Sequence, residues 1–243
     1  MRKTKRAHPN IKSQKSQKSQ NTSKRQFIYI PGRGSNSSTN KIITKIFPRI
    51  PHSKLHFFDY QSKSKLSDNI RLLWDTIGLS PTDAVNRLVE LINSVEPTHI
   101  IAHSHGSLIL FNSLQRINKT TLKKIKWIRT YGGRKPIPNT ISDHHINCIN
   151  HYNKLDRVLH TLLNLNIVPQ EIIDKNGTTE YDNVTYQISY SMKDTKGVDI
   201  MHKNSNYTLR KKMLRCSNDT EDSHKIGCYM NTLSHDIKEL KAL

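Results

Sequence analysis

The chain has 243 residues, of which 34% are hydrophobic, and a chain of this length can bury one core of ordinary size. Its 39 Lys and Arg against 19 Asp and Glu give a net charge of +20, which attracts polyanions without selecting one. No apolar run is long enough for a membrane span or a signal peptide, so we expect an intracellular, cytoplasmic protein. Cys148, Cys216 and Cys228 form no C-x-x-C pair, which excludes a disulfide framework but leaves open whether Cys216 pairs with Cys228.

Residues 1–25 are basic, contain no Asp or Glu, and carry almost no large apolar side chains. Burial cannot offset the entropy of ordering such a segment, so we expect a disordered tail followed by one domain over residues 26–243. The tail could contact nucleic acid or an anionic membrane non-specifically, or it could be a solvated extension. Nuclear or organelle targeting stays open, although the tail lacks the amphipathic face that presequences usually have.

The domain begins with an apolar segment, Gln26–Ile30, which predicts a strand that runs into Pro31-Gly32-Arg33-Gly34. This Gly-x-Gly lacks the third Gly of a dinucleotide fingerprint and the Lys-Ser/Thr of a P-loop, which argues against a phosphate cradle. Helices and a strand alternate after it: helix 41–47, strand 55–60, helix 66–77, and a helix that Ser80-Pro81 opens. The alternation predicts a mainly parallel sheet flanked by helices, with functional groups at the carboxyl ends of the strands.

The most informative stretch is Thr98–Leu110, where an apolar run ends in Ala102-His103-Ser104-His105-Gly106 and a segment with helical spacing follows. A strand, a sharp turn and a helix would hold Ser104 in a strained backbone conformation and lift its hydroxyl clear of the sheet. Residues two before and two after Ser104 must then be small, and Ala102 and Gly106 meet that need. The amino end of the helix would offer amide groups to a developing oxyanion.

These residues resemble the nucleophile elbow of the α/β-hydrolase superfamily, in particular of its lipases and serine esterases. The family usually has Gly at the position of Ala102, although Ala occurs in some lipases. The resemblance implies a three-layer α/β-hydrolase-like fold, a mainly parallel sheet flanked by helices, and no cofactor or metal. It also implies that Ser104 is the nucleophile and that the backbone amides of Arg33 and His105 form the oxyanion hole.

The same resemblance indicates where the other two members of a catalytic triad should lie. Strands are predicted at 126–131 and 145–152. Just after the second strand, Asn153, Asp156 and Val158 match the family pattern around the acid, so Asp156 is the implied acid of the triad. The alternative is that Asp156 only caps the following helix. The base should follow the last strand, 184–190, and His202 lies there, with His235 and then His224 as rivals. That strand is either a parallel edge strand or half of a hairpin that turns at Asn176-Gly177.

Two other functions compete with ester hydrolysis. His103 and His105 form a His-x-His pair, to which Asp143-His144-His145 could add metal ligands. Metallo-β-lactamase-like hydrolases continue this pair with Asp-His, whereas this chain has Ser107 and Leu108 at those positions, which argues against a metal site. We therefore expect a serine hydrolase that cleaves a carboxylic ester or thioester, small-molecule or lipid, through an acyl-enzyme. Arg33 and the overall charge would suit an anionic substrate such as a phospholipid. The alternative is an inactive hydrolase scaffold that binds nucleic acid or an anionic membrane through its basic tail.

Overall fold

The structure is a computed structural model, and it describes residues 25–33, 40, 43–44, 53–60, 83–153, 156–165, 171, 177–181, 184–190 and 226–242. Several sequence predictions lie outside these residues: most of the basic tail, the helix at 66–77, Ser80-Pro81, and the two candidate bases His202 and His224.

The described residues form a seven-stranded sheet with the strand order β2-β1-β3-β4-β7-β9-β8. All neighbouring strands are parallel except β8 and β9, which are antiparallel. The strands are β1 (Arg25–Ile30), β2 (Ser53–Phe57), β3 (His99–His103), β4 (Trp127–Tyr131), β7 (Asn147–Tyr152), β8 (Gly177–Tyr181) and β9 (Val184–Tyr190). The prediction of a mainly parallel sheet is confirmed.

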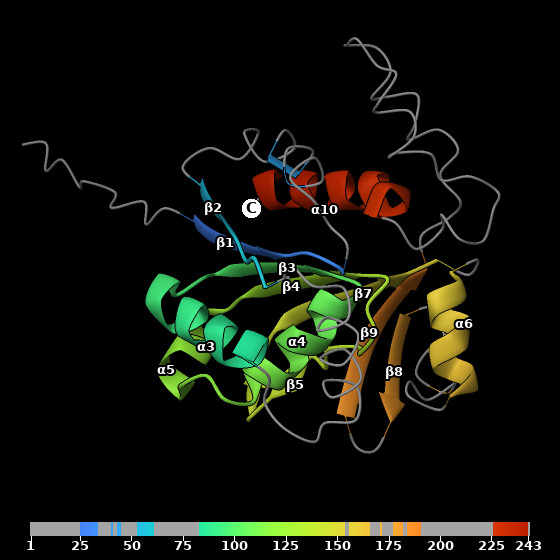
Figure 1. Cartoon of the computed structure of the whole chain (residues 1–243), viewed down its shortest axis with the longest axis horizontal. Coiled ribbons are helices and arrows are strands. Elements are labelled where there is room, and N and C mark those ends of the chain that lie inside the picture. The colour runs from blue at the N-terminus through green and yellow to red at the C-terminus, as the bar shows by residue number, and fades with distance from the viewer. Residues whose placement is uncertain are drawn as a thin grey trace, which may run out of the picture.

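Helices cover both faces of the sheet, as Figure 1 shows, so the predicted three-layer α/β architecture is confirmed as well. On one face lie α3 and α4, and on the other lies α10, which follows the short 3-10 helix η2. Near the β8 edge lies α6. The helices are α3 (Asp83–Val95), α4 (His105–Leu114), α5 (Lys119–Lys124), α6 (Arg157–Asn164), η2 (Ile226–Tyr229) and α10 (Met230–Ala242).

Alternation along the strands divides the core into two parts. Successive side chains of a strand point to opposite faces, so in β1 Ile28 packs in the cluster with α3 and α4, whereas Phe27 and Tyr29 pack in the cluster with α10. The two strands beside β3 are β1 and β4, and both run parallel to it. The strand β3 is buried along its whole length. The carboxyl end of β3 is therefore held rigidly where α4 begins.

Sequence analysis missed α10, although Met230, Leu233, Ile237 and Leu240 recur at helical spacing and are all buried. They complete the cluster on the sheet face opposite α3 and α4. A helix is recognised less easily when its apolar stripe is only one residue wide. This helix brings residues from the end of the chain onto the central strands.

The strand at residues 184–190 forms half of a hairpin and is parallel to its other neighbour, but it is not an edge strand, because β8 lies outside it. On one side β9 runs parallel to β7, and on the other it forms an antiparallel pair with β8. The predicted turn position was wrong, because Gly177 starts β8 and the pairing of Tyr181 with Val184 makes the chain reverse between these two residues. A two-residue connection suffices for such a reversal.

None of the helices in the described residues combines the length and the apolar character that a membrane span requires. Cys148 is a buried free thiol, whose pKa burial raises to about 12, while Cys228 is disulfide-bonded to a residue outside the described part of the chain.

Candidate active site

Ser104 occupies the strand-to-helix turn with a backbone conformation that few residues adopt. Its φ is 51° and its ψ is −124°, between the end of β3 at His103 and the start of α4 at His105. A non-glycine residue at such a φ stores strain of about 1–3 kcal/mol, which persists only where the surroundings hold it in place. The local backbone is therefore the strained elbow that the sequence predicts.

Four hydrogen bonds hold the backbone of Ser104 in this conformation. Its amide donates to the carbonyl of Tyr131 at 3.0 Å, which extends the pairing of β3 with β4 by one residue. Its carbonyl accepts from the amide of Ser107 at 3.0 Å, from Oγ of Ser107 at 2.8 Å, and from the amide of Arg134 at 3.3 Å. Because an acceptor in β4 holds the amide, and donors in α4 and in the loop after β4 hold the carbonyl, the strain cannot relax by rotation of the peptide units.

Two glycines let the loop after β1 approach this turn closely. A Cβ on Gly106 would lie 2.7 Å from the carbonyl oxygens of both Ile30 and Pro31, and a Cβ on Gly32 would lie 2.8 Å from Cβ of Ser104. Real Cβ atoms do not come so near to backbone atoms. The small residue predicted after the serine is thus required by the end of β1, and the loop that carries Arg33 lies against the elbow.

The proposed oxyanion-hole residues, Arg33 and His105, lie on the two segments that meet here. His105 is the first residue of α4 and is 4% exposed, whereas Arg33 is exposed in the loop after β1. Tyr60 connects these segments, because its hydroxyl donates to the carbonyl of Pro31 at 3.1 Å and its ring lies 5.9 Å from that of His105. The structure thus brings both proposed residues to the same side of the elbow.

Asp156 follows β7, two strands away from β3, and is fully buried. Its Oδ1 accepts from the amides of Val158 at 2.8 Å and Leu159 at 3.4 Å, so it caps the amino end of α6. Its Oδ2 accepts from the hydroxyl of Tyr229 at 3.2 Å. The capping alternative is therefore correct as far as Oδ1 is concerned, and it does not conflict with a catalytic role, because Oδ2 does not take part in the cap.

The proposed base, His202, lies outside the described residues, as does His224. The rival His235 lies on the exposed side of α10, where Nδ1 is 3.5 Å from Oε1 of Glu239 and 72% of the side chain is exposed. Ser104, in contrast, is 6% exposed. A base that must take a proton from a buried hydroxyl does not suit the position of His235.

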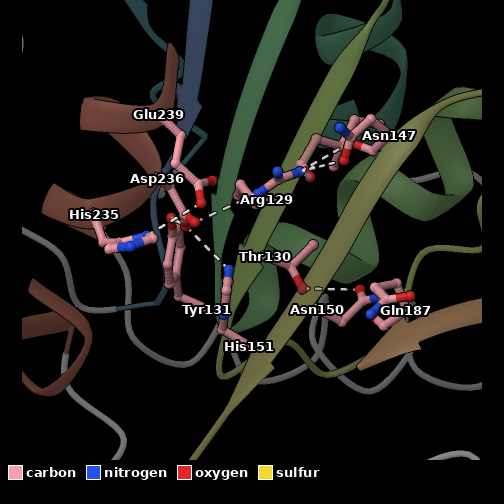
Figure 2. A network of polar contacts seen from close by, with 11 residues as sticks. Arg129, Thr130, Tyr131, Asn147, Asn150, His151, Gln187, His235, Asp236 and Glu239 are labelled. Carbon is pink, nitrogen blue, oxygen red and sulfur yellow. Dashed lines mark hydrogen bonds and ion pairs between the residues drawn. The ribbon is translucent and has the colours of Figure 1, made fainter. Parts of the chain in front are cut away.

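A buried polar network centred on Asp236 escaped the sequence analysis. Figure 2 shows its carboxylate between Tyr131, His151 and Arg129, which come from β4 and β7. The Tyr131 hydroxyl donates to Oδ2, Nε2 of His151 lies 3.0 Å from the same oxygen, and Nε of Arg129 lies 3.7 Å from Oδ1. Burial alone would raise the pKa of Asp236, but the contacts with His151, Tyr131 and Arg129 outweigh burial and lower it.

The metal site considered as an alternative to the serine nucleophile would require His103 and His105 to face one ion, but in the described residues their rings have different neighbours. His103 and His105 contact different aromatic rings, those of Tyr229 at 6.3 Å and Tyr60 at 5.9 Å. Asp143 lies in a tight turn between two short antiparallel strands, β5 (Thr140–Ile141) and β6 (His144–His145). The strand predicted at 145–152 therefore begins only at Asn147, the first residue of β7.

In the described residues, the group with metal-ligand spacing is formed by His235, Asp236 and Glu239 on α10. The oxygens of Asp236 already face Tyr131, His151 and the guanidinium of Arg129, so a cation there would be repelled by a neighbouring positive charge.

No protein-family model matches the chain, and no curated protein matches it. Among solved structures, it is similar to a candidate hydrolase of the alpha/beta superfamily from Xanthomonas campestris pv. campestris, with 10% identity and a TM-score of 0.44 over 90% of this chain and 99% of that chain. A likeness of this size carries no argument about activity. The function of this chain has to be argued from its own residues.

Proposed function

We propose that the chain is a serine hydrolase that cleaves a carboxylic ester or thioester, with Ser104 as its nucleophile. The observation that supports this most strongly is the strained backbone of Ser104, with φ at 51°, at the junction of β3 and α4. An inert serine at a strand-to-helix turn has no need of strain worth about 1–3 kcal/mol, or of two neighbouring segments that maintain it. For a nucleophile, the strained turn lifts the hydroxyl clear of the sheet and places it beside the first amides of a helix.

In the proposed reaction, Oγ of Ser104 attacks the carbonyl carbon while His202 takes the hydroxyl proton. The amides of Arg33 and His105 stabilise the oxyanion of the tetrahedral intermediate, and each such donor typically lowers the barrier by about 3–4 kcal/mol. The intermediate expels the alcohol or thiol, which takes the proton from His202 and leaves an acyl-Ser104. Water then attacks this ester, with His202 again as the base. Asp156 orients His202 and stabilises its cation.

The positions of the acid and the base along the sheet support the same proposal. Asp156 follows β7 and the segment after β9 contains His202, so both come after strands that lie on the same side of β3. Because β3, β7 and β9 are parallel, their carboxyl ends meet at one edge of the sheet. A Ser, Asp, His order along the chain accompanies this arrangement.

Labelling with a fluorophosphonate probe tests the proposal directly. We expect the wild-type protein to be labelled, Ser104→Ala to be unlabelled, and His202→Ala to be labelled at least a hundredfold more slowly. His235→Ala is the matched control, since His235 is exposed on α10, and it should be labelled at the wild-type rate. A folded wild-type protein that takes no label would refute the nucleophile assignment. The binding scaffold would then be the remaining function, tested by binding of the basic tail to nucleic acid and anionic vesicles.

A further inference from the structure

Three basic residues gather around the elbow from two different loops. Arg33 follows Gly32 in the loop after β1, and Arg134 and Lys135 lie in the loop after β4. The amide of Arg134 donates to the carbonyl of Ser104 at 3.3 Å, and the amide of Lys135 donates to Oγ of Ser107 at 3.4 Å. The loop after β4 is thus attached to the turn that carries the proposed nucleophile, and the loop after β1 packs against that turn, because a Cβ on Gly32 would lie 2.8 Å from Cβ of Ser104.

These three cations have no acidic partner among the described residues. The ion pairs of that part of the chain involve other basic residues, such as Arg129 with Asp236 and Lys124 with Glu96. The ammonium of Lys135 lies 4.9 Å from the ring centre of Phe111 instead. The site thus contrasts with the network on α10, where a carboxylate compensates the buried guanidinium.

Arg33 and Arg134 lie on the two loops that meet at Ser104, since Gly32 packs against its side chain and the amide of Arg134 donates to its carbonyl at 3.3 Å. Burial lowers the pKa of Arg134, the charge of Arg33 lowers it further, and only Tyr60 acts in the opposite direction. Burial also lowers the pKa of Lys135. A guanidinium that is partly removed from water beside a like charge is destabilising, and an anion bound between Arg134 and Arg33 would relieve that cost.

We propose that Arg33 and Arg134 form an anion-binding subsite beside Ser104, and that the ester cleaved there carries a phosphate or carboxylate group; the ammonium of Lys135 lies over Phe111, further along α4, and is not part of it. This inference rests on the proposed function and adds the class of substrate to it. Guanidinium groups present paired N–H donors that match the oxygens of phosphate and carboxylate, and both cations of the subsite are arginines. The anionic group would position the scissile carbonyl against Ser104.

Binding of inorganic phosphate tests the subsite without any need for catalysis. Isothermal titration should show phosphate binding to the wild-type protein, at least tenfold weaker binding to Arg134→Gln, and weaker binding as the salt concentration rises. Arg116→Gln is the matched control, because it removes the same charge from an exposed residue after the far end of α4 and should bind phosphate like wild type. If the wild-type protein binds no phosphate, or if Arg134→Gln binds it equally well, the subsite does not exist.

Selectivity between matched esters tests whether the subsite serves hydrolysis. The first pair is the p-nitrophenyl monoester of glutarate and p-nitrophenyl pentanoate, which differ by a terminal carboxylate; the second is an acylglycerol phosphate and the corresponding acylglycerol. In at least one pair, kcat/KM should be tenfold or more higher for the anionic ester. Arg134→Gln should lower that ratio about tenfold, and Arg134→Lys should largely keep it. Equal rates for both members of both pairs would overturn the substrate class.

The two experiments separate the two ways of being wrong. Phosphate binding without fluorophosphonate labelling of Ser104 would leave the subsite standing and remove the proposed function. Labelling of Ser104 with neither phosphate binding nor selectivity for anionic esters would leave a serine hydrolase and remove the subsite.

Discussion

Tyr229 donates its hydroxyl hydrogen to Oδ2 of Asp156 at 3.2 Å, while Oδ1 of the same carboxylate accepts from the amide of Val158 at 2.8 Å. Burial, followed by the charge and the hydrogen bond of Asp156, raises the pKa of Tyr229 well above its usual value, so its hydroxyl remains a donor at any physiological pH. The carboxylate of Asp156 thus caps α6 through Oδ1, while Tyr229 fixes its orientation through Oδ2. Mutagenesis can separate the effect of the cap on stability from the effect of the charge on catalysis.

Asp156→Asn should separate the cap of α6 from the proposed catalytic role. The amide oxygen of Asn can still cap the helix, so the free energy of unfolding should change by no more than about 1 kcal/mol. Loss of the charge should lower kcat by about 10³–10⁴, because the base would no longer be held in the correct tautomer. Urea unfolding and ester hydrolysis measure the two effects. Asn118→Ala is the control, since Asn118 caps α5 through the amide of Thr121 at 2.7 Å and its loss should lower stability only. Wild-type kcat in Asp156→Asn would make Asp156 a cap alone.

Gly106→Ala should destabilise the fold, because the new methyl group would lie 2.7 Å from two backbone carbonyl oxygens at the end of β1. Backbone atoms of a buried strand cannot move as a flexible side chain can, so we expect a loss of about 2–3 kcal/mol in the free energy of unfolding. Ser94→Ala, on the exposed side of α3, should change it by less than about 0.5 kcal/mol. Urea unfolding of both variants is the measurement, and equal stability would contradict the close approach of β1 to the elbow.

Asp236→Ala should be far more costly than the loss of a surface ion pair. The side chains of Arg129 and Asp236 are 3% and 5% exposed, so removing the carboxylate leaves a buried guanidinium uncompensated, at a cost of about 3–5 kcal/mol. Lys124→Ala breaks a pair whose side chains are 42% and 47% exposed, and it should cost less than about 1 kcal/mol. Chemical unfolding compares the two variants. Similar losses would show that the network contributes little to the attachment of α10.

Stability should fall as the pH falls below about 6.5, and His99 should account for part of this loss. Burial, with the charges of Arg25 and Arg129, lowers the pKa of His99 from 6.5 to about 4. Between these values the unfolded chain binds a proton that the folded chain does not, so the free energy of unfolding decreases with decreasing pH, by about 2 kcal/mol at pH 5. His99→Phe keeps a ring stacked on Phe27, 4.5 Å away in the wild type, and should reduce the stability difference between pH 7 and pH 5 by that amount.

A second acid-dependent loss should follow at lower pH. The pKa of Asp236 is lowered from 3.8, so the stability that this carboxylate contributes is present above that value and is lost as the pH falls through its folded-state pKa. Unfolding of wild type and His99→Phe across the acid range measures both steps. An unchanged pH dependence in His99→Phe would contradict the first.

The elbow could be predicted from the sequence because its determinants are local. Ala102, Ser104 and Gly106 lie within five positions, so the pattern can be recognised in the sequence, although the contact that requires Gly106 is made with Ile30 and Pro31 at the end of β1. Asp156 was predicted from its place shortly after a strand, and its catalytic role stays a prediction. Its cap of α6 is also a local effect, and the sequence analysis named it as the alternative.

The polar contacts that sequence analysis missed join residues far apart in the chain. Tyr131 and Asp236 are separated by 105 positions, and the spacing of residues in the sequence contains no information about such a pair. The sequence likewise does not show that the loops carrying Arg33 and Arg134 meet at the elbow, because these loops follow β1 and β4, the strands that flank β3. The alternation of strands and helices predicts a parallel sheet, but not which charged side chains share its edge.

The position of α10 has a consequence for how the protein forms during synthesis. A guanidinium nitrogen of Arg25, at the start of β1, donates to the carbonyl of Leu240 in α10, across 215 positions of the chain. At translation rates of about 5–20 residues per second, roughly 10–40 s pass between the synthesis of these two residues. During that interval the apolar face formed by β1 and β3 lacks its covering helix. The nascent chain should therefore be a candidate for chaperone binding until residue 240 has emerged from the ribosome.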